Sequence, residues 1–324
     1  MVSPVSVSPV VRSKAERLGA AGQEWLGRLP ATVGELAARW SLDLGPALPG
    51  GSEGYVARAR TAAGEDVVLK VALPGNGDRE AAVLRRAGGR GYARLLAHDP
   101  GRDAMLLEAL GASLEQLRWP VERQIDVLCA TLRLAWRVEP GAGDVSEEKA
   151  AGLGELVARL WEELGRPCPE AVVRRALGYA RRRAAGDAPE RAVLVHGDPH
   201  PGNALQRAGA AGGSGDMGDL GSFAFVDPDG FRCDPAYDLG VVLRDWCAEL
   251  LAAADPAALA RRYCARIAAG GGADAVAVWE WGYLERVSTG LYLLAHGAAA
   301  EARPFLETAE ILLGAAPPSS RNEG

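Results

Sequence analysis

Residues 196–203 read HGDPHPGN and follow the apolar run AVLV, so Asp198 stands just past the end of an expected buried strand. The run FAFVDPDG repeats this pattern and ends its own strand in Asp227. If the two strands are adjacent, Asp198, Asn203 and Asp227 gather three hard oxygen groups at one edge of a small sheet. Magnesium prefers oxygen ligands and is commonly held by one or two carboxylates together with nucleotide phosphates. The pattern therefore predicts a Mg²⁺ and nucleotide site.

Asp198 also has the position of a catalytic base. Phosphoryl transfer needs a residue that orients the attacking hydroxyl and accepts its proton, and such a residue lies near the metal without being its main ligand. The alternative is that Asp and Asn at strand ends only form local turns or helix caps. Their occurrence as a pair, with Lys70 upstream in VVLKVA, favours the chemical interpretation.

Lys70 stands in the middle of an expected strand, where a charge is unfavourable unless its end is paired or reaches a cleft. A lysine that points to solvent from an edge strand is the alternative. One hairpin earlier, PGGSEGY supplies Gly50, Gly51 and Gly54, where bare backbone could approach phosphates closely. These glycines match no GxGxxG or P-loop pattern, and a plain turn would have the same composition.

The elements that position these residues follow from the rest of the chain. Its 324 residues are 48% hydrophobic and 24% charged, which is typical of a globular protein large enough for two packed units. Helical spacing in residues 12–29 and 32–40 precedes two strands, 55–60 and 67–72, and a helix in DREAAVLRRAGG. Helices dominate after the short strand AMLLEAL. The glycine-rich run at 208–222 predicts a flexible hairpin loop.

Charge and cysteine usage exclude several classes of protein. The net charge is −6 and the pI is about 5.4, so no basic surface for nucleic acid is expected. Five cysteines without a CxxC pair predict neither a disulfide framework nor a thiolate metal site. The start of the chain does not resemble a signal peptide, and no run of about 18 apolar residues occurs. We therefore expect a cytoplasmic protein with no membrane partner.

HGDPHPGN followed by FVDPD resembles the catalytic loop and metal motif of the aminoglycoside phosphotransferase family, antibiotic kinases built on the protein-kinase fold. The resemblance implies an α+β, two-lobed fold. Its small N-terminal lobe, residues 1–107, has an antiparallel sheet and a helical extension. A hinge at 108–112 leads to a larger, mainly helical lobe, 113–324.

The same resemblance implies a role for each motif residue. Asp198 matches the catalytic base, and Asn203 and Asp227 match the ligands of Mg²⁺. His196 matches the histidine that holds the loop through a backbone hydrogen bond. Asp238 matches an aspartate that supports the loop from the helix behind it, although a helix N-cap is an equal alternative.

On the nucleotide side, the resemblance implies that Lys70 contacts the α- and β-phosphates of ATP and that Glu80 holds this lysine. LLEAL resembles the hinge, so the backbone of residues 107–110 is expected to bind adenine, with Glu108 and Leu110 nearest. A plain connector between domains would look the same.

The acceptor is expected to be a small molecule, because no long activation segment with an APE motif follows Asp227. Carboxylates near the site would select ammonium or guanidinium groups, as in a cationic acceptor. The candidates, each of which could also be an ordinary surface charge, are Asp229, Asp234, Asp245, Glu280 and Glu285.

A longer stretch, GAAGQEWLGRLPATVGELAARWSL with GYARLLAHDPGRDAMLLEAL, is similar to the branch with streptomycin 6-kinases and hydroxyurea phosphotransferases. This implies an ATP- and Mg²⁺-dependent kinase acting on a hydroxyl of a streptomycin-type aminoglycoside and giving resistance. A kinase of an endogenous metabolite such as an amino sugar, or a regulatory nucleotide-binding module without turnover, remains an alternative. The oligomeric state stays open.

Overall fold

The computed structural model describes residues 5–49, 53–141, 144, 148–186, 189–207 and 222–318. The chain divides into two compact units. The first contains the residues up to Gly111 and, after a return of the chain, Gln206 and Arg207; the second contains Ala112–Leu205 and the described residues from Ser222 onward. The junction between the two units, at Gly111 and Ala112, falls within residues 108–112, the expected hinge.

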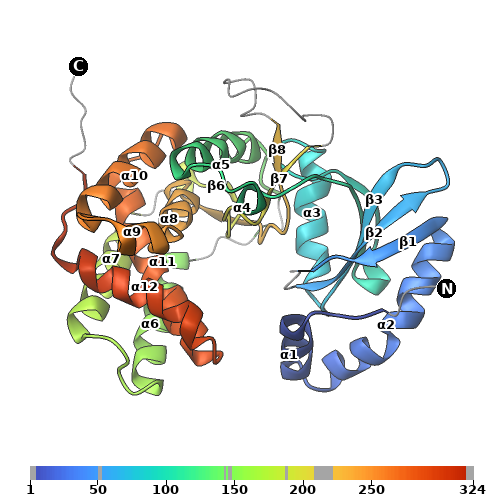
Figure 1. Cartoon of the computed structure of the whole chain (residues 1–324), viewed down its shortest axis with the longest axis horizontal. Coiled ribbons are helices and arrows are strands. Elements are labelled where there is room, and N and C mark those ends of the chain that lie inside the picture. The colour runs from blue at the N-terminus through green and yellow to red at the C-terminus, as the bar shows by residue number, and fades with distance from the viewer. Residues whose placement is uncertain are drawn as a thin grey trace. The chain divides into compact units, whose positions relative to one another are not determined.

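The first unit is built around a five-stranded antiparallel sheet in the order β1-β2-β3-β5-β4 (Figure 1). Its elements, in chain order, are α1 (Pro9–Arg17), α2 (Ala20–Arg39), β1 (Leu42–Ala47), β2 (Gly54–Thr61), β3 (Asp66–Ala72), α3 (Gly77–Ala87), β4 (Leu95–Asp99), the 3₁₀ turn η1 (Pro100–Arg102) and β5 (Ala104–Glu108). The expected strands 55–60 and 67–72 are β2 and β3. The two expected helical stretches 12–29 and 32–40 become α1 and one longer helix, α2, which continues through Pro30.

Helices cover both faces of this sheet. Leu29, Val33 and Leu36 of α2 pack on Leu69 and Val71 of β3, together with neighbouring side chains of β2 and β5. Since successive side chains of a strand point to opposite faces, the residue between Leu69 and Val71 points away from α2. That residue is Lys70, and α3 lies on its side of the sheet. The alternation of β3 therefore places a lysine between a strand and a helix.

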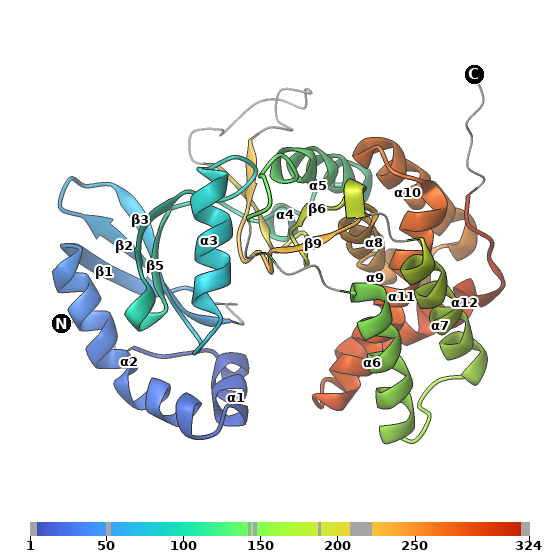
Figure 2. The same ribbon diagram turned by 180° about the vertical axis from the view of Figure 1, so that it is seen from behind.

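The second unit is mainly helical, with two short β-ribbons (Figure 2). Its elements, in chain order, are α4 (Leu114–Leu117), α5 (Val121–Ala135), α6 (Lys149–Glu163), α7 (Glu170–Ala185), η2 (Pro189–Arg191), β6 (Val193–Val195), β7 (Ala204–Gln206), β8 (Phe223–Phe225), β9 (Phe231–Cys233), α8 (Ala236–Arg244), α9 (Cys247–Ala252), α10 (Pro256–Gly271), α11 (Ala275–Ala295), α12 (Ala299–Ile311) and η4 (Leu312–Gly314).

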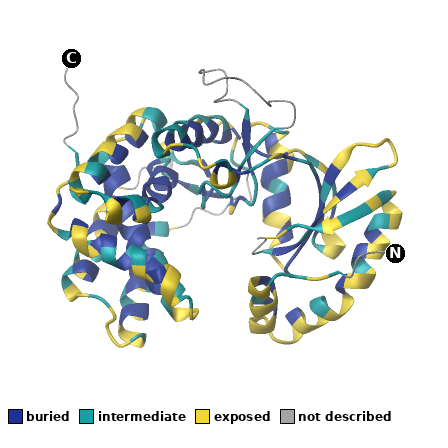
Figure 3. Ribbon diagram, in the orientation of Figure 1, coloured by how far each residue is buried: buried dark blue, intermediate teal, exposed yellow. Residues whose placement is uncertain are grey.

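The core of this unit surrounds α11, which packs against α6, α7, α8 and α12. Buried residues are concentrated in α8 and α11, and Trp279 and Trp281 are among them (Figure 3). The two helices approach closely at Gly240 of α8, where an added Cβ atom would lie 2.4 Å from Cβ of Trp281. Only glycine fits there, so the packing fixes α8 against α11.

One expectation about the strands is wrong. The strands before Asp198 and Asp227 do not pair with each other, because β6 pairs with β9 and β7 pairs with β8. The two strand ends are joined instead by the loops that follow them: Val226 N donates to Asn203 O at 3.0 Å, and the His196 ring bonds to Val226 O at 2.9 Å. The glycine-rich run expected to be a hairpin loop lies, apart from Ser222, outside the described residues.

Candidate active site

Lys70 and Glu80 form a buried ion pair in the first unit. Lys70 Nζ donates to Glu80 Oε2 at 2.6 Å, and the two residues are only 2% and 6% exposed. Glu80 belongs to the first turn of α3, and Lys70 stands opposite Val56 and Met105 in the sheet. A buried charge is tolerated when it is paired. This contact excludes the alternative of a lysine that points to solvent.

Of the three glycines before β3, Gly50 and Gly51 lie outside the described residues. Gly54 is the first residue of β2, where a Cβ atom would stand 2.3 Å from the carbonyl oxygen of Val71. The close approach of β2 to β3 therefore requires glycine at this position, whatever else the residue does. A contact between Gly54 and phosphates stays a prediction.

The expected hinge begins at the end of β5. The Glu108 backbone N–H donates to Arg94 O at 3.0 Å, so it is already used within the unit. The Glu108 carboxylate accepts hydrogen bonds from Arg94 N at 2.8 Å and from Arg207 Nη1 at 2.7 Å. Through the second of these bonds, Arg207 is attached to Glu108, the last residue of β5. Leu110 is buried, and its contact with adenine stays a prediction.

His196 organises residues 196–203 of the second unit, which are the expected catalytic loop. Its Nδ1 accepts from Asp198 N at 3.1 Å, so the ring proton is on Nε2, which donates to Val226 O at 2.9 Å. Burial lowers the pKa of His196 to about 4, because no water can solvate an imidazolium there. A neutral His196 therefore joins the loop that carries Asp198 to the strand end that carries Asp227.

Asp238 supports the same loop from the first turn of α8. Its carboxylate accepts from His196 N, Gly197 N and Trp136 Nε1, each at 2.9 Å. Burial raises the pKa of Asp238 to about 6, although these three donors favour the ionised form. The side chain thus contacts the loop rather than capping α8.

Asn203 and Asp227 lie on neighbouring segments of the chain, because Val226 N donates to Asn203 O. Asn203 Nδ2 donates to Asp198 O at 3.1 Å, which leaves its amide oxygen for a ligand. Asp227 has a φ of +57°, a left-handed conformation that a non-glycine residue keeps only when its surroundings enforce it. An amide and a carboxylate oxygen suit Mg²⁺, which takes its other ligands from water and phosphates. Within the described residues, no three His, Cys, Asp or Glu side chains gather as a metal site.

Asp198 has a partner that the sequence analysis missed. Arg244 Nη2, at the end of α8, donates to Asp198 Oδ1 at 2.8 Å. Desolvation is the largest single influence and would raise the pKa of Asp198, but the charge and hydrogen bond of Arg244, together with His200 and His196, outweigh it, so the pKa lies below its ordinary value. His200 Nε2 lies 3.7 Å from the other oxygen, Oδ2. An arginine inside the apolar helix GVVLRDW was the available sequence signal.

The five predicted substrate acids have different surroundings. Glu280 is 3% exposed, and both of its oxygens face arginines, Arg182 and Arg183, at 2.6 Å. Glu285 and Asp245 are both bonded to Arg244. Glu280, Glu285 and Asp245 thus each have an arginine partner inside the second unit, and binding of an acceptor by any of them stays a prediction.

The other two acids are Asp229 and Asp234. Asp229 lies next to the catalytic loop, where its backbone N–H donates to His196 O at 2.8 Å. Asp234 accepts from Ala236 N at 2.8 Å. Binding of an acceptor by either carboxylate stays a prediction.

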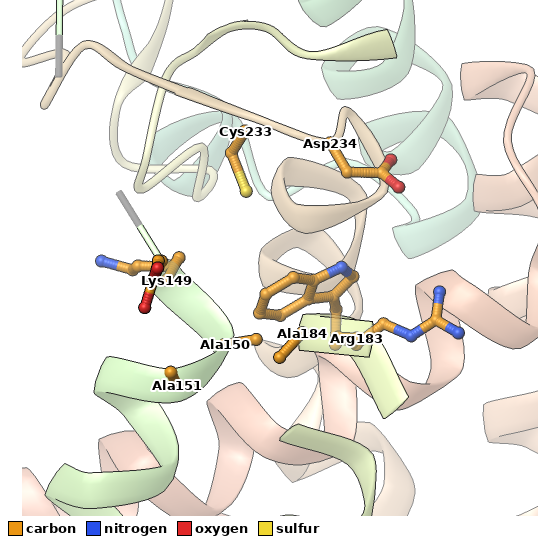
Figure 4. Close-up of a pocket in the computed structure, with 9 residues that line it drawn as sticks. Lys149, Ala150, Ala151, Arg183, Ala184, Cys233 and Asp234 are labelled. Carbon is orange, nitrogen blue, oxygen red and sulfur yellow. The ribbon is translucent and has the colours of Figure 1, made fainter. Parts of the chain in front are cut away.

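Asp234 lines a cavity of about 230 Å³ in the second unit. The walls come from the start of α6, the end of α7, the β9–α8 connection and α11, with Lys149, Arg183 and Trp281 among the lining residues (Figure 4). Lys149 Nζ also lies 4.8 Å and 5.3 Å from the ring centroids of Phe231 and Tyr237. The Tyr237 hydroxyl is 3.3 Å from Gly197 O, so one aromatic ring links this cavity to the catalytic loop.

Among the described helices, none combines the length and the apolar composition that crossing a bilayer requires.

Comparisons with known proteins agree with this geometry. The model of a family described as aminoglycoside/hydroxyurea antibiotic resistance kinase matches residues 39–297. The chain is 29% identical to streptomycin 6-kinase of Streptomyces glaucescens over 318 residues, covering 94% of this chain and 96% of that protein. It is 32% identical to hydroxyurea phosphotransferase of Kitasatospora aureofaciens over 236 residues, covering 68% and 62%.

A solved structure shares the fold. The GDP and kanamycin complex of the phosphotransferase APH(2")-IIIa aligns with a TM-score of 0.53 at 13% identity, covering 82% of this chain and 92% of that one. The two-lobe, protein-kinase-like α+β fold is thereby confirmed. The chain belongs to the aminoglycoside/hydroxyurea antibiotic resistance kinase family and is a phosphotransferase that acts on a hydroxyl group.

Proposed function

We propose that the protein transfers the γ-phosphoryl group of ATP to a hydroxyl of a streptomycin-type aminoglycoside, with Mg²⁺ as cofactor. The observation that carries this proposal is the convergence of Asp198, Asn203 and Asp227 through backbone hydrogen bonds. The similarity to a streptomycin 6-kinase over 94% of the chain supports the acceptor class.

Each residue then has one task. Asp198 accepts the proton of the acceptor hydroxyl while the hydroxyl oxygen bonds to the γ-phosphorus and ADP leaves. Asn203 and Asp227 would hold Mg²⁺, which neutralises charge on the phosphates. Lys70, held by Glu80, binds phosphate oxygens. Asp238 and His196 fix the loop so that Asp198 does not move away during transfer.

We place part of the acceptor in the cavity next to Tyr237. Its volume of about 230 Å³ is below the roughly 300–1,000 Å³ of complete small-molecule sites, so it suits one ring or one arm of a ligand. Asp234 in its wall supplies a carboxylate for an ammonium or guanidinium group.

The test is acceptor-dependent release of ADP from MgATP across streptomycin, kanamycin, hydroxyurea and amino sugars. Asp198→Ala serves as the blank, and Asp126→Ala, a substitution of a surface aspartate paired with Arg266, serves as the matched control. Release with streptomycin that Asp198→Ala abolishes and Asp126→Ala retains supports the proposal. Release with hydroxyurea or an amino sugar alone would show that the acceptor is not a streptomycin-type aminoglycoside. No acceptor-dependent release at all would refute the proposed phosphoryl transfer.

A further inference from the structure

The two carboxylate oxygens of Asp198 have different surroundings. Oδ1 accepts a hydrogen bond of 2.8 Å from Arg244, whereas Oδ2 lies 3.7 Å from His200 Nε2, beyond hydrogen-bond distance. The Asp198 side chain is 44% exposed, although Arg244 is only 12% exposed. One oxygen is therefore held by the protein, and the other remains available to a ligand.

Arg244 is itself held from two sides. Its Nε donates to Asp245 Oδ1 at 3.0 Å, and its Nη1 lies 3.4 Å from Glu285 Oε2. A guanidinium group is a planar fork with donors in several fixed directions, so it can contact three carboxylates at once. These two contacts hold the long side chain of Arg244 in one conformation. In that conformation its remaining nitrogen, Nη2, points at Asp198.

Glu285 connects Arg244 to the rest of the loop. Its other oxygen, Oε1, accepts from the Tyr237 hydroxyl at 2.8 Å, and this hydroxyl lies 3.3 Å from Gly197 O. Glu285 belongs to α11, against which α8 is fixed at Gly240. The residue before Asp198 and the side chain of Asp198 are therefore located by the same buried group of side chains.

We propose that Arg244 is a positioning residue for phosphoryl transfer: it holds Asp198 through Oδ1 so that Oδ2 is directed at the acceptor hydroxyl. Asp245 and Glu285 hold Arg244 in turn. In the transfer, Oδ2 takes the hydroxyl proton while the hydroxyl oxygen forms its bond to the γ-phosphorus. This inference rests on the proposed function and adds three residues that act on the base rather than on the substrate.

A purely structural role of Arg244 makes a different prediction, and a double-mutant cycle separates the two. If Arg244 acts through Asp198, then Arg244→Gln lowers kcat only while Asp198 is present. Misplacing a reacting group by about 1 Å costs on the order of 100-fold in rate, which is the loss expected for Arg244→Gln. In an Asp198→Asn background, the same change is expected to cost less than about threefold.

The experiment measures kcat and both KM values for the acceptor that gives ADP release in the wild type. The expected result for Arg244→Gln is a lower kcat with KM values within about threefold of the wild type. Arg244→Lys keeps the charge but lacks the fork, so it is expected to remain at least about tenfold below the wild-type kcat. Arg266→Gln, which breaks an Arg–Asp pair of the same unit, is the control and leaves kcat unchanged.

Three outcomes would overturn the inference. If Arg244→Gln lowers kcat by the same factor in the wild-type and Asp198→Asn backgrounds, Arg244 acts on the structure in general and not through Asp198. A raised acceptor KM with an unchanged kcat would make it a binding residue. Full activity of Arg244→Lys would show that charge alone suffices.

Where Arg244→Gln does not fold, Glu285→Gln tests the same support. It is expected to lose about tenfold in kcat, again only when Asp198 is present, and a wild-type kcat would count against the proposal. Absence of acceptor-dependent release in the wild type would refute the proposed function instead, before any variant is compared.

Discussion

Lys70 Nζ lies 2.6 Å from Glu80 Oε2 in the interior of the first unit, with the sheet on one side and α3 on the other. A buried pair of this kind contributes little net stability, because desolvation offsets most of the attraction. Its presence between a strand and a helix is better explained by a function of the lysine.

Replacement of Lys70 by Met is expected to lower the free energy of unfolding by about 3–5 kcal/mol, because Glu80 is left buried without its cation. The double variant Lys70→Met/Glu80→Leu should regain most of this stability in urea unfolding. It should not regain ADP release, since the group proposed to bind phosphate is missing. Recovery of activity in the double variant would reduce the pair to a structural role.

The left-handed backbone of Asp227 allows its proposed role in metal binding to be separated from its cost to the stability of the fold. Asp227→Ala and Asp227→Gly should both lose Mg²⁺-dependent nucleotide binding. The Ala variant should be about 1–2 kcal/mol less stable than the Gly variant, because a Cβ atom is unfavourable at a φ of +57°. Titration with nucleotide and thermal unfolding check the two effects, and equal stabilities would contradict the backbone argument.

His196 should make the fold less stable in acid. Its pKa is about 4 in the folded protein and about 6.5 in an unfolded chain, so protonation favours the unfolded state. The stabilising contribution is present above pH 6.5 and falls by roughly 3 kcal/mol as the pH drops to 4. In urea unfolding, the difference in unfolding free energy between the wild type and His196→Gln should therefore fall by roughly 3 kcal/mol from pH 7 to pH 4. The exposed His296→Gln should follow the wild-type pH profile.

Asp238 should have the opposite effect on the pH dependence of stability, making the fold less stable as the pH rises. Burial raises its pKa to about 6 from an unfolded value near 3.9, so its contribution falls by roughly 2 kcal/mol as the pH rises from 4 to 6. In the wild type the two effects offset each other. Asp238→Asn should therefore show a steeper gain of stability with rising pH than the wild type. A parallel pH profile for the two proteins would show that Asp238 does not titrate in this range.

Much of the site could be predicted because its residues are close in sequence. His196, Asp198 and Asn203 share one loop, and Lys70 is the one charged residue in the apolar run VVLKVA. Arg244 could not be predicted in its role, because it contacts a residue 46 positions away through a long side chain, and helical periodicity says nothing of such a contact. The pairing of the short strands was wrong for a similar reason. Strands of three residues carry too little pattern to choose between partners.

Helix α8 carries Asp238, which bonds to the backbone of residues 196 and 197, and Arg244, which bonds to the proposed base, Asp198. These two positions are six residues apart, which corresponds to roughly 9 Å along the helix axis. One residue inserted between them would keep every side chain of the site but turn Arg244 by about 100° relative to Asp238. In diverging relatives, a change in this spacing would therefore mark the loss of catalysis even where each functional amino acid is still present.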